Sequence, residues 1–230
     1  MPFQLLTSNP ARDLKLPKRV GKEMKSLSPD SAQRFLKECA KDAHGLLFEF
    51  AIVTGMRPGE YLGLRWSDVD LKENKVSIQQ TLVRHRKGGG FEFAPPKTPK
   101  SRRTIPIPSY LKSQLAEAKM RQNETRLKAG PQWQDYNLVF ASEVGTPLSL
   151  RNLQRRHFKP ILKRAKLEDI RTYDLRHSCA TLLLSADENP KVVAERLGHA
   201  SIVLTLNTYS HVLPTMQEGA TDKLERILKK

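Results

Sequence analysis

The first segment that could bind an anion surrounds Arg57, which lies between Thr54-Gly55 and Pro58. We expect a buried helix to end at the glycine and a new helix to start at the proline. Arg57 would then lie beside a helix N-terminus, where free N–H groups and the helix dipole favour negative charge. Glu60, three residues later, could hold the guanidinium in place. Taken alone, the segment is better explained by a surface arginine beside a helix-start glutamate.

A second arginine, Arg176, follows Tyr173 by three residues, so the two side chains should share one face of a helix. A guanidinium fork matches two oxygens of a phosphate, and two such groups directed at one place would form a clamp. Asp174 should point elsewhere and cap the helix. The alternative is a basic helix start with Tyr173 in the core.

A histidine and a tyrosine complete the set. His199 follows Leu197-Gly198 in a sharp turn between two expected helices, and Tyr209 lies on the second of them. A histidine at such a turn could donate to a phosphate oxygen, although a lone histidine is more often structural. Tyr209 shares a helix face with Ile202 and Leu206, and taken alone it could simply be a core aromatic residue.

The hydrophobic pattern predicts a mostly α-helical α+β domain with one small antiparallel sheet. Strands are expected within 69–83, with a turn at Asn74, and at 91–93 and 104–107, on either side of a hairpin tip at 97–100. Expected helices begin at Ser28-Pro29 and Pro58 and cover 46–53, 111–129, 149–166, 174–185, 190–197 and 201 to about 211.

The composition favours a polyanionic partner. The 230 residues carry 40 Lys and Arg against 24 Asp and Glu, a formal net charge of +16. Such a charge suggests nucleic acid but does not by itself exclude a basic protein with no such partner. Cys39 and Cys179 lie in apolar helical patterns and read as buried thiols, not as a disulfide or zinc framework. No apolar run has membrane-spanning length, so we expect a cytoplasmic protein.

In this order and spacing, the segments resemble the tyrosine recombinase (phage integrase) family. Thr54 to Glu60 matches its T-G-x-R-x-x-E segment, Tyr173 to His177 its H-x-x-R-H box, and Leu197 to His199 its L-G-H segment. Thr205 to His211 matches the T-x-x-x-Y-x-H segment of the nucleophile, and Lys97 a lysine on a β-hairpin. The resemblance covers nearly the whole chain, and several spaced motifs are far more specific than any one of them.

The resemblance implies a site-specific DNA recombinase or integrase that serves a mobile element. Tyr209 would attack a DNA phosphodiester to form a 3′-phosphotyrosyl link, releasing a 5′-hydroxyl that later rejoins the partner strand. Arg57, Arg176 and His199 would stabilise the charge of the transition state, and Lys97 would protonate the leaving oxygen, with Lys100 as the rival donor. Neither a metal nor any other cofactor is expected, because the arginines can replace a metal ion and the bond energy stays in the covalent link.

One residue departs from the family pattern. Tyr173 stands where the family usually has histidine. A phenol can keep the hydrogen-bonding role of that histidine, but with a pKa near ~10 it is a poorer base at neutral pH. His177 is expected to be a less suitable substitute, because it should point to another face of the helix.

Basic segments beside these residues would supply affinity for double-stranded DNA. Residues 84–103 hold seven basic side chains and one acidic one, and residues 151–176 hold nine and three. The candidate DNA contacts are Lys100, Arg102, Arg103, Arg151, Arg155 and Arg156. For any single one of them, a solvated basic face remains the alternative.

The expected organisation is a basic arm or interdomain linker at 1–25 and a catalytic domain at 26–230. Only the short arm precedes the expected catalytic domain, so we expect the chain to be a fragment that lacks the N-terminal DNA-binding domain of the family. The resemblance implies a homotetramer on two duplexes, with accessory DNA-bending proteins, in a bacterial or phage-infected cell. The segment 210–230 would be exchanged between subunits, and packing within its own subunit is the alternative.

Three rivals remain on sequence grounds. One is a DNA-binding protein that kept the fold and lost catalysis, for which Tyr173 leaves room. Another is a type IB topoisomerase, although the L-G-H segment and its short spacing to Tyr209 favour a recombinase. The third is a basic structural protein, which would not explain the ordered motifs.

Overall fold

A computed structural model describes residues 24–85, 90–96, 98, 101–210, 225 and 227–229. Its α-helices are α1 (Pro29–Cys39), α2 (Gly45–Thr54), α3 (Pro58–Leu62), α4 (Ser109–Ala129), α5 (Leu150–Leu153), α6 (Lys159–Arg164), α7 (Asp174–Ser185), α8 (Pro190–Leu197) and α9 (Ile202–Thr208). Its strands are β1 (Val69–Asp70), β2 (Lys75–Ser77), β3 (Thr81–Arg84), β4 (Phe91–Ala94) and β5 (Thr104–Pro106). The expected arm at 1–25, except for its last two residues, and the segment 211–224 lie outside the described residues.

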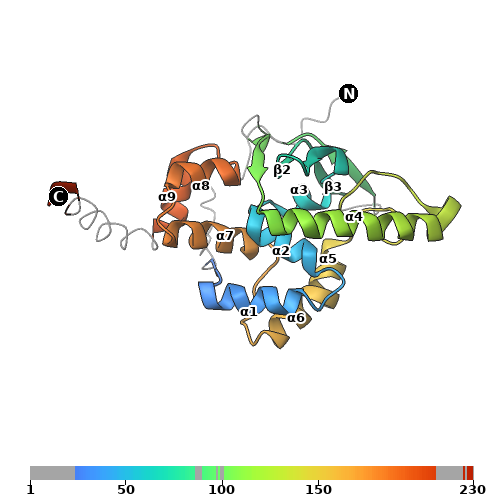
Figure 1. The fold of residues 1–230 in the computed structure, drawn as a ribbon, viewed down its shortest axis with the longest axis horizontal. Coiled ribbons are helices and arrows are strands. Elements are labelled where there is room, and N and C mark those ends of the chain that lie inside the picture. Colours follow the sequence, from blue (N-terminus) through green and yellow to red (C-terminus); the bar gives the residue numbers. More distant parts are fainter. Residues whose placement is uncertain are drawn as a thin grey trace, which may run out of the picture.

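The mostly helical α+β class is confirmed, with α2 at the centre of the fold (Figure 1). The apolar sequence Gly-Leu-Leu-Phe-Glu-Phe-Ala-Ile-Val-Thr buries seven of the ten residues of α2. Helix α2 packs against α1 on one side and α7 on another. Because burial of apolar area is the main stabilising force in folding, this contact anchors the C-terminal end of α2, where Arg57 follows.

The strands form two small antiparallel sheets instead of the single one expected. One has the order β1-β2-β5, and the other pairs β3 with β4. The two sheets are separated at residues 78–80. Before this stretch β2 pairs with β5, and after it β3 pairs with β4. Gln80 donates from its side-chain amide to the carbonyl oxygen of Gly63, so this stretch is tied to the end of α3 instead of to a strand.

Helix α3 lies directly on β3, and two glycines make this possible. A Cβ at Gly63 would lie 2.8 Å from the backbone nitrogen of Leu82, and one at Gly59 would lie 2.9 Å from its carbonyl oxygen. Any side chain at either position would push the helix away from the strand. The start of α3, and Arg57 with it, is therefore held against the sheet.

The expected basic helix at 149–166 is present, but its middle has a different helical pitch. Ser149 caps α5, residues 154–158 form a π-helical turn, and α6 follows. In the π turn the N–H of Lys159 donates to the carbonyl of Gln154. Pro160 follows immediately and has no N–H for the regular helical bond, which explains the change of pitch at this point.

Helices α7, α8 and α9 form one end of the molecule, in orange in Figure 1. Helices α7 and α8 occupy the predicted ranges, whereas α9 ends at Thr208, earlier than the predicted His211. A small core of Ala180, Leu184, Val193, Leu197 and Tyr209 holds this end together. Within the described residues, no helix combines the length and apolarity needed to cross a bilayer.

Candidate active site

Arg57 is fixed at the N-cap of α3 by its interaction with Glu60. Its backbone N–H donates to Oε2 of Glu60 at 2.8 Å, and its Nη1 donates to Oε1 at 3.0 Å. The Arg57 side chain is 35% exposed, whereas that of Glu60 is 5% exposed. The predicted supporting contact of Glu60 is thus present, and it holds the guanidinium while leaving part of it accessible.

Glu60 also binds Arg103, which comes from the segment before β5. The two guanidinium nitrogens of Arg103 reach the two carboxylate oxygens at 3.2 and 2.9 Å. Burial alone would raise the pKa of Glu60, but hydrogen bonds and charge from Arg103 and Arg57 prevail and hold that pKa below its ordinary value. Glu60 therefore stays ionised and joins two arginines that lie far apart in the sequence.

Arg103 has a different environment from the one its basic neighbours suggested. Its side chain is 7% exposed, and its Nε donates to the carbonyl of Arg196 at the end of α8 at 2.6 Å. The guanidinium points into the protein, where it contacts Glu60 and the end of α8. In this structure Arg103 connects the segment before β5 with α3 and α8, and the proposed DNA contact would require it to leave that position.

Arg176 is the most deeply buried arginine of the site, at 2% exposure. Its Nη1 donates to the carbonyl of Gly55 at 2.9 Å, whereas its Nη2 is buried without a hydrogen-bond partner. Burial, together with the positive charge of Arg57, lowers the pKa of Arg176 to about 10. A buried N–H group without a partner is costly, so an anion at this position would be strongly favoured.

His199 follows Gly198, whose backbone is left-handed with φ of 68°. Its Nδ1 lies 2.7 Å from the hydroxyl of Thr205, which is fully buried in α9. Burial lowers the pKa of His199 to about 4, and Arg176, Arg57 and Arg103 act in the same direction. At neutral pH His199 is therefore a neutral ring whose orientation is fixed by Thr205.

Arg57 and His199 line the same hollow, of about 340 Å³, together with Glu60 and Leu204. The charges of Arg57 and Arg103 also act on Arg176. Three guanidinium groups against the single carboxylate of Glu60 leave a formal charge of 3 − 1 = +2. This excess of positive charge, with an unpaired donor of Arg176 inside it, suits a phosphate.

Tyr209 is the C-cap of α9 and is 2% exposed. Its hydroxyl lies 2.9 Å from Nδ1 of His177 on α7. Burial raises the pKa of the Tyr209 phenol, and the charge of Arg176 opposes that effect. The phenol is therefore held within the protein in its neutral form, near the arginines but hydrogen-bonded to a histidine.

Tyr173, in contrast, is 39% exposed and lies on the outer side of His177. The two rings meet edge to face with centroids 5.3 Å apart. Asp174 is the first residue of α7 and accepts the backbone N–H of Arg171 at 2.8 Å. Tyr173 occupies the N-cap position without a side-chain cap hydrogen bond, so the expected capping of the helix by Asp174 is not observed. Tyr173 thus touches the site through His177.

His177 is the residue that the sequence interpretation set aside. His177 does point to a different face of α7 from Arg176. However, the end of α9 lies against that face, and Tyr209 contacts His177 there. The direction of a side chain about one helix does not reveal which second helix will lie there. The only available signal was the histidine itself, next to an arginine and on the same helix as Tyr173.

The remaining basic candidates fall into two groups. Arg102, Arg151, Arg155 and Arg156 are exposed, and Arg102 lines a hollow that also includes His199. Lys97 and Lys100 lie outside the described residues. In the part of the chain that the structure describes, no group of three His, Cys, Asp or Glu side chains could hold a metal ion.

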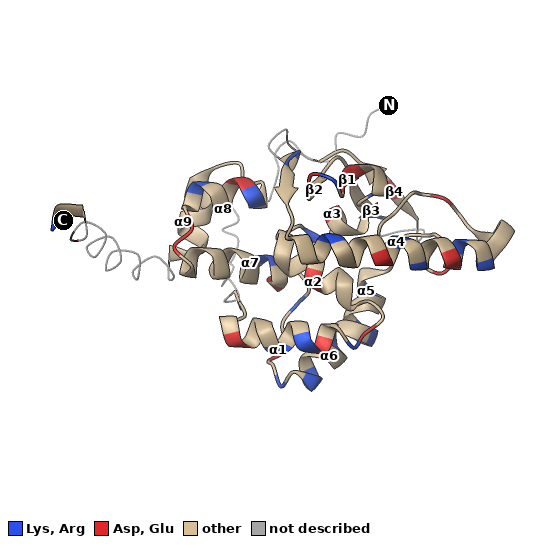
Figure 2. Ribbon diagram, in the orientation of Figure 1, with Lys and Arg blue, Asp and Glu red and all other residues tan. Residues whose placement is uncertain are grey.

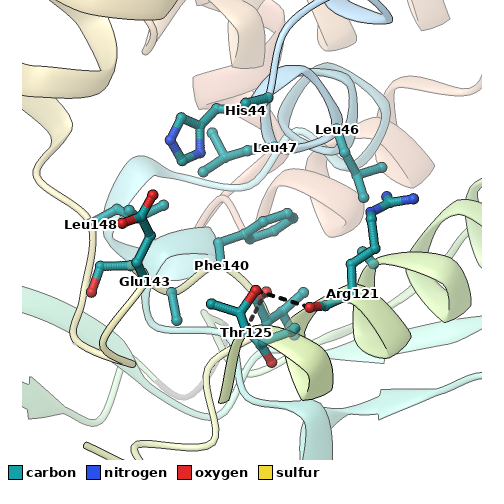
Figure 3. Close-up of a pocket in the computed structure, with 14 residues that line it drawn as sticks. His44, Leu46, Leu47, Arg121, Thr125, Phe140, Glu143 and Leu148 are labelled. Carbon is teal, nitrogen blue, oxygen red and sulfur yellow. Dashed lines mark hydrogen bonds between the residues drawn. The ribbon is translucent and has the colours of Figure 1, made fainter. Parts of the chain in front are cut away.

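A separate hollow of about 480 Å³ lies between α2, α4 and residues 139–148 and includes none of these side chains (Figure 3). Leu47 lines it from α2, His44 from the position just before α2, and Arg121 and Thr125 from α4. Helix α4 carries both signs of charge (Figure 2), with five basic side chains against Glu117 and Glu124, so this helix is also basic. This hollow differs from the candidate site because Arg57, Arg176, His199 and Tyr209 are not among the residues that line it.

The fold and this site together define a class of protein. The structure superposes on the Tn1549 transposon integrase in complex with transposon right end DNA with a TM-score of 0.75, at 21% identity, covering 95% of this chain and 72% of that one. The catalytic domain of bacteriophage HP1 integrase gives a TM-score of 0.54 at 22% identity, covering 87% and 95% of the two chains. The fold is that of the catalytic domains of integrases and tyrosine recombinases.

The sequence itself leads to the same class. The sequence model of the Phage integrase family matches residues 25–216, and the chain belongs to this family. It is 35% identical to a "Tyrosine recombinase XerC-like" protein of Caldanaerobacter subterraneus over 90% of this chain and 55% of that protein. It is 31% identical to the ICEBs1 integrase of Bacillus subtilis over 98% and 61%, respectively. The chain thus spans little more than half the length of these relatives.

Proposed function

We propose that this chain provides the catalytic part of a site-specific DNA recombinase or integrase for a mobile element. The observation that carries the proposal is the arrangement around Arg176. A buried guanidinium with an unpartnered nitrogen lies beside Arg57 and His199, and Tyr209 is the C-cap of the neighbouring α9. That arrangement matches a phosphate group attacked by a tyrosine.

In this mechanism, Arg57 and Arg176 bind the non-bridging oxygens of the scissile phosphate. In the tautomer whose Nδ1 accepts from the Thr205 hydroxyl, His199 donates a third hydrogen bond from Nε2. Donors of this kind, fixed before the reaction, commonly contribute ~3–4 kcal/mol each to the stability of the transition state. Glu60 keeps Arg57 in place, and its second partner Arg103 keeps the segment before β5 next to the site.

Tyr209 attacks phosphorus, and the bond to the 5′ oxygen breaks. Lys97 is proposed to protonate that oxygen, with Lys100 as the rival. The product is a 3′-phosphotyrosyl link, which the 5′-hydroxyl of a partner strand reverses. No nucleotide is consumed, because each bond formed replaces one of the same kind.

The proposed partner is double-stranded DNA, contacted by Arg102, Arg151, Arg155 and Arg156. The Tn1549 integrase and XerH structures contain DNA substrates, which supports this assignment for a chain of the same fold. Four subunits would assemble on two duplexes, with 210–230 exchanged between them, and accessory DNA-bending proteins could assist. The domain division at residue 25 and a cytoplasmic location belong to the same proposal.

Covalent capture tests the proposal directly. The protein and its Tyr209→Phe variant are each mixed with nicked and sheared DNA from the source genome, denatured in detergent, and assayed for protein bound to DNA. Attachment by the unaltered protein alone is expected, and sequencing of the trapped DNA would give the target site. Attachment by neither, also in a longer chain that includes any N-terminal domain, would contradict catalysis and leave a DNA-binding protein. Relaxation of supercoils without strand exchange would point to a topoisomerase.

A further inference from the structure

The contact between His177 and Tyr209 brings a basic nitrogen to the candidate nucleophile. The 2.9 Å separation of Nδ1 and the phenolic oxygen is within hydrogen-bonding distance. Both side chains are held by packing: Tyr209 lies in the small core with Leu184, Val193 and Leu197, and His177 is half-buried between Tyr209 and Tyr173. A general base must lie within about 2.6–3.2 Å of the proton it removes, and this pair meets that requirement.

The surroundings of His177 favour a neutral ring. Burial lowers its pKa, the charges of Arg176 and Arg171 act in the same direction, and Asp174 opposes them. From α9 it faces the Tyr209 phenol, and from the turn before α9 it faces His199, which is neutral at pH 7. A neutral imidazole with its proton on Nε2 leaves Nδ1 free to accept from the Tyr209 hydroxyl.

The other candidates for this role are less well placed. Nδ1 of His199 is occupied by the Thr205 hydroxyl, and this histidine lines the hollow beside Arg57. Tyr173 lies against the far side of His177 and is 39% exposed. His177 lies between the exposed Tyr173 and the buried Tyr209, and its ring is in hydrogen-bond contact with the attacking oxygen.

We propose that His177 is a catalytic residue, the general base that accepts the phenolic proton of Tyr209 as this side chain attacks DNA. The proposal rests on the proposed function of Tyr209. The Tyr209 oxygen–phosphorus bond forms, the bond from phosphorus to the 5′ oxygen breaks, and the Tyr209 proton moves to Nδ1 of His177. The 5′ oxygen takes a separate proton from its own donor. In the reverse transfer, the departing phenolate recovers its proton from His177.

The first test needs no DNA. Nitrogen-15 NMR of the histidine rings reports which nitrogen carries the proton. We expect His177 to be the Nε2–H tautomer at pH 7, with a hydrogen-bond shift at Nδ1 that disappears in Tyr209→Phe. A proton on Nδ1 would mean that His177 donates to the phenol, and it would overturn the proposal.

The second test measures single-turnover cleavage of a suicide duplex that contains the site recovered by covalent capture. His177→Gln can still hydrogen-bond to Tyr209 but cannot hold its proton, so cleavage should fall on the order of 10²-fold. His177→Ala should be equally slow and should recover in part with added imidazole. His44→Gln is the matched control, because His44 is also half-buried with a lowered pKa but lies at the opposite end of α2, and its rate should not change.

The pH profile separates a base from a residue that only positions the tyrosine. Cleavage by the unaltered protein should decline as the pH falls through the lowered pKa of His177, below 6.5. In His177→Gln that decline should be replaced by a rate that rises steadily with pH. A duplex with sulfur in place of the 5′ oxygen, which leaves without a proton, should not rescue the variant.

Other outcomes have clear meanings. Full activity of His177→Gln with an unchanged profile, or faster cleavage because the buried phenol is released, would show that His177 only stores the nucleophile and would overturn the proposal. If the unaltered protein forms no covalent link at all, the proposed function fails instead. DNA binding and thermal unfolding of each variant verify that it is folded.

Discussion

The two halves of the candidate site are built in different ways. The half that would bind phosphate is anchored by buried charges: Glu60 joins Arg57 to Arg103, and Arg176 is bonded to Gly55 at the end of the central helix. The half that carries Tyr209 depends on a small core, and α9 buries only Thr205 among its seven residues. Its residues Ile202, Val203 and Leu204 are 40–55% exposed.

This difference suggests a division of labour. Electrostatic stabilisation of a transition state works best with groups that need not rearrange, which the buried ion pairs provide. A nucleophile that must reach phosphorus, and later return, is better placed on an element with few buried contacts. The contrast can be tested at each half separately.

The largest effect is expected from Glu60→Gln. Removing one partner from a buried ion pair leaves both arginines uncompensated, which typically costs ~3–5 kcal/mol. Urea unfolding should show this loss at pH 7, whereas Glu117→Gln, which breaks an exposed pair on α4, should change stability by less than about 0.5 kcal/mol. A small effect at Glu60 would mean that the phosphate-binding half is not anchored by charge.

The same variant tests the pH dependence. The pKa of Glu60 is lowered in the folded protein, so its contribution to stability is present above its unfolded value of about 4.5 and is lost as the pH falls through its folded value. The stability difference between the unaltered protein and Glu60→Gln should therefore shrink below pH 4.5.

Arg176→Lys should reduce covalent DNA cleavage by roughly 10²- to 10³-fold, because an ammonium group cannot bond Gly55 and a phosphate oxygen with one planar fork. Single-turnover assays at saturating DNA measure this effect. Arg171→Lys is the control and should keep its activity, because the Arg171 side chain is exposed and pairs with Asp174 at the start of α7. Equal losses in both variants would indicate a general effect on α7.

Hydrogen exchange should separate the halves by at least about tenfold in protection. Amides of α2, which is buried along most of its length, should exchange near the rate of global unfolding. Amides of α9 should exchange faster, through local opening. Equal protection would show that the small core of α7 and α8 holds Tyr209 as firmly as the main core holds Arg57.

Thr205→Val should have the smallest effect. It removes the hydroxyl that orients His199 and should slow cleavage about five- to tenfold, the value of one neutral hydrogen bond. Thr125→Val, which removes an exposed hydroxyl bonded to the carbonyl of Arg121, should leave the rate unchanged. No difference between the two variants would mean that His199 is held by packing alone.

Much of this architecture could be predicted because it depends on local signals. The caps at Ser28, Asn189 and Ser201, and the prolines after the first two, place helix starts that the structure confirms. The pairing of Glu60 with Arg57 followed from their spacing. The change of strand partner after β2 could not be predicted, because it depends on the contact of α3 with β3.

The environments of Arg103 and His177 were also inaccessible from sequence. A run of basic residues predicts an exposed surface, yet Arg103 is drawn inward by a carboxylate 43 residues earlier. The alignment of Tyr209 with His177 depends on how α9 crosses α7, and no spacing within either helix encodes that crossing.

Gly198 lies against Arg103, and this contact links two positions that are distant in sequence. A Cβ at residue 198 would lie 2.8 Å from Nη1 of Arg103, so a side chain there would displace the guanidinium from Glu60. If the side chain at position 103 were shorter, part of that clash would be relieved. The remaining cost would come mainly from the left-handed backbone at position 198. Substitutions at the two positions should therefore be non-additive, and over evolutionary time a glycine at 198 and a long side chain at 103 should be gained or lost together.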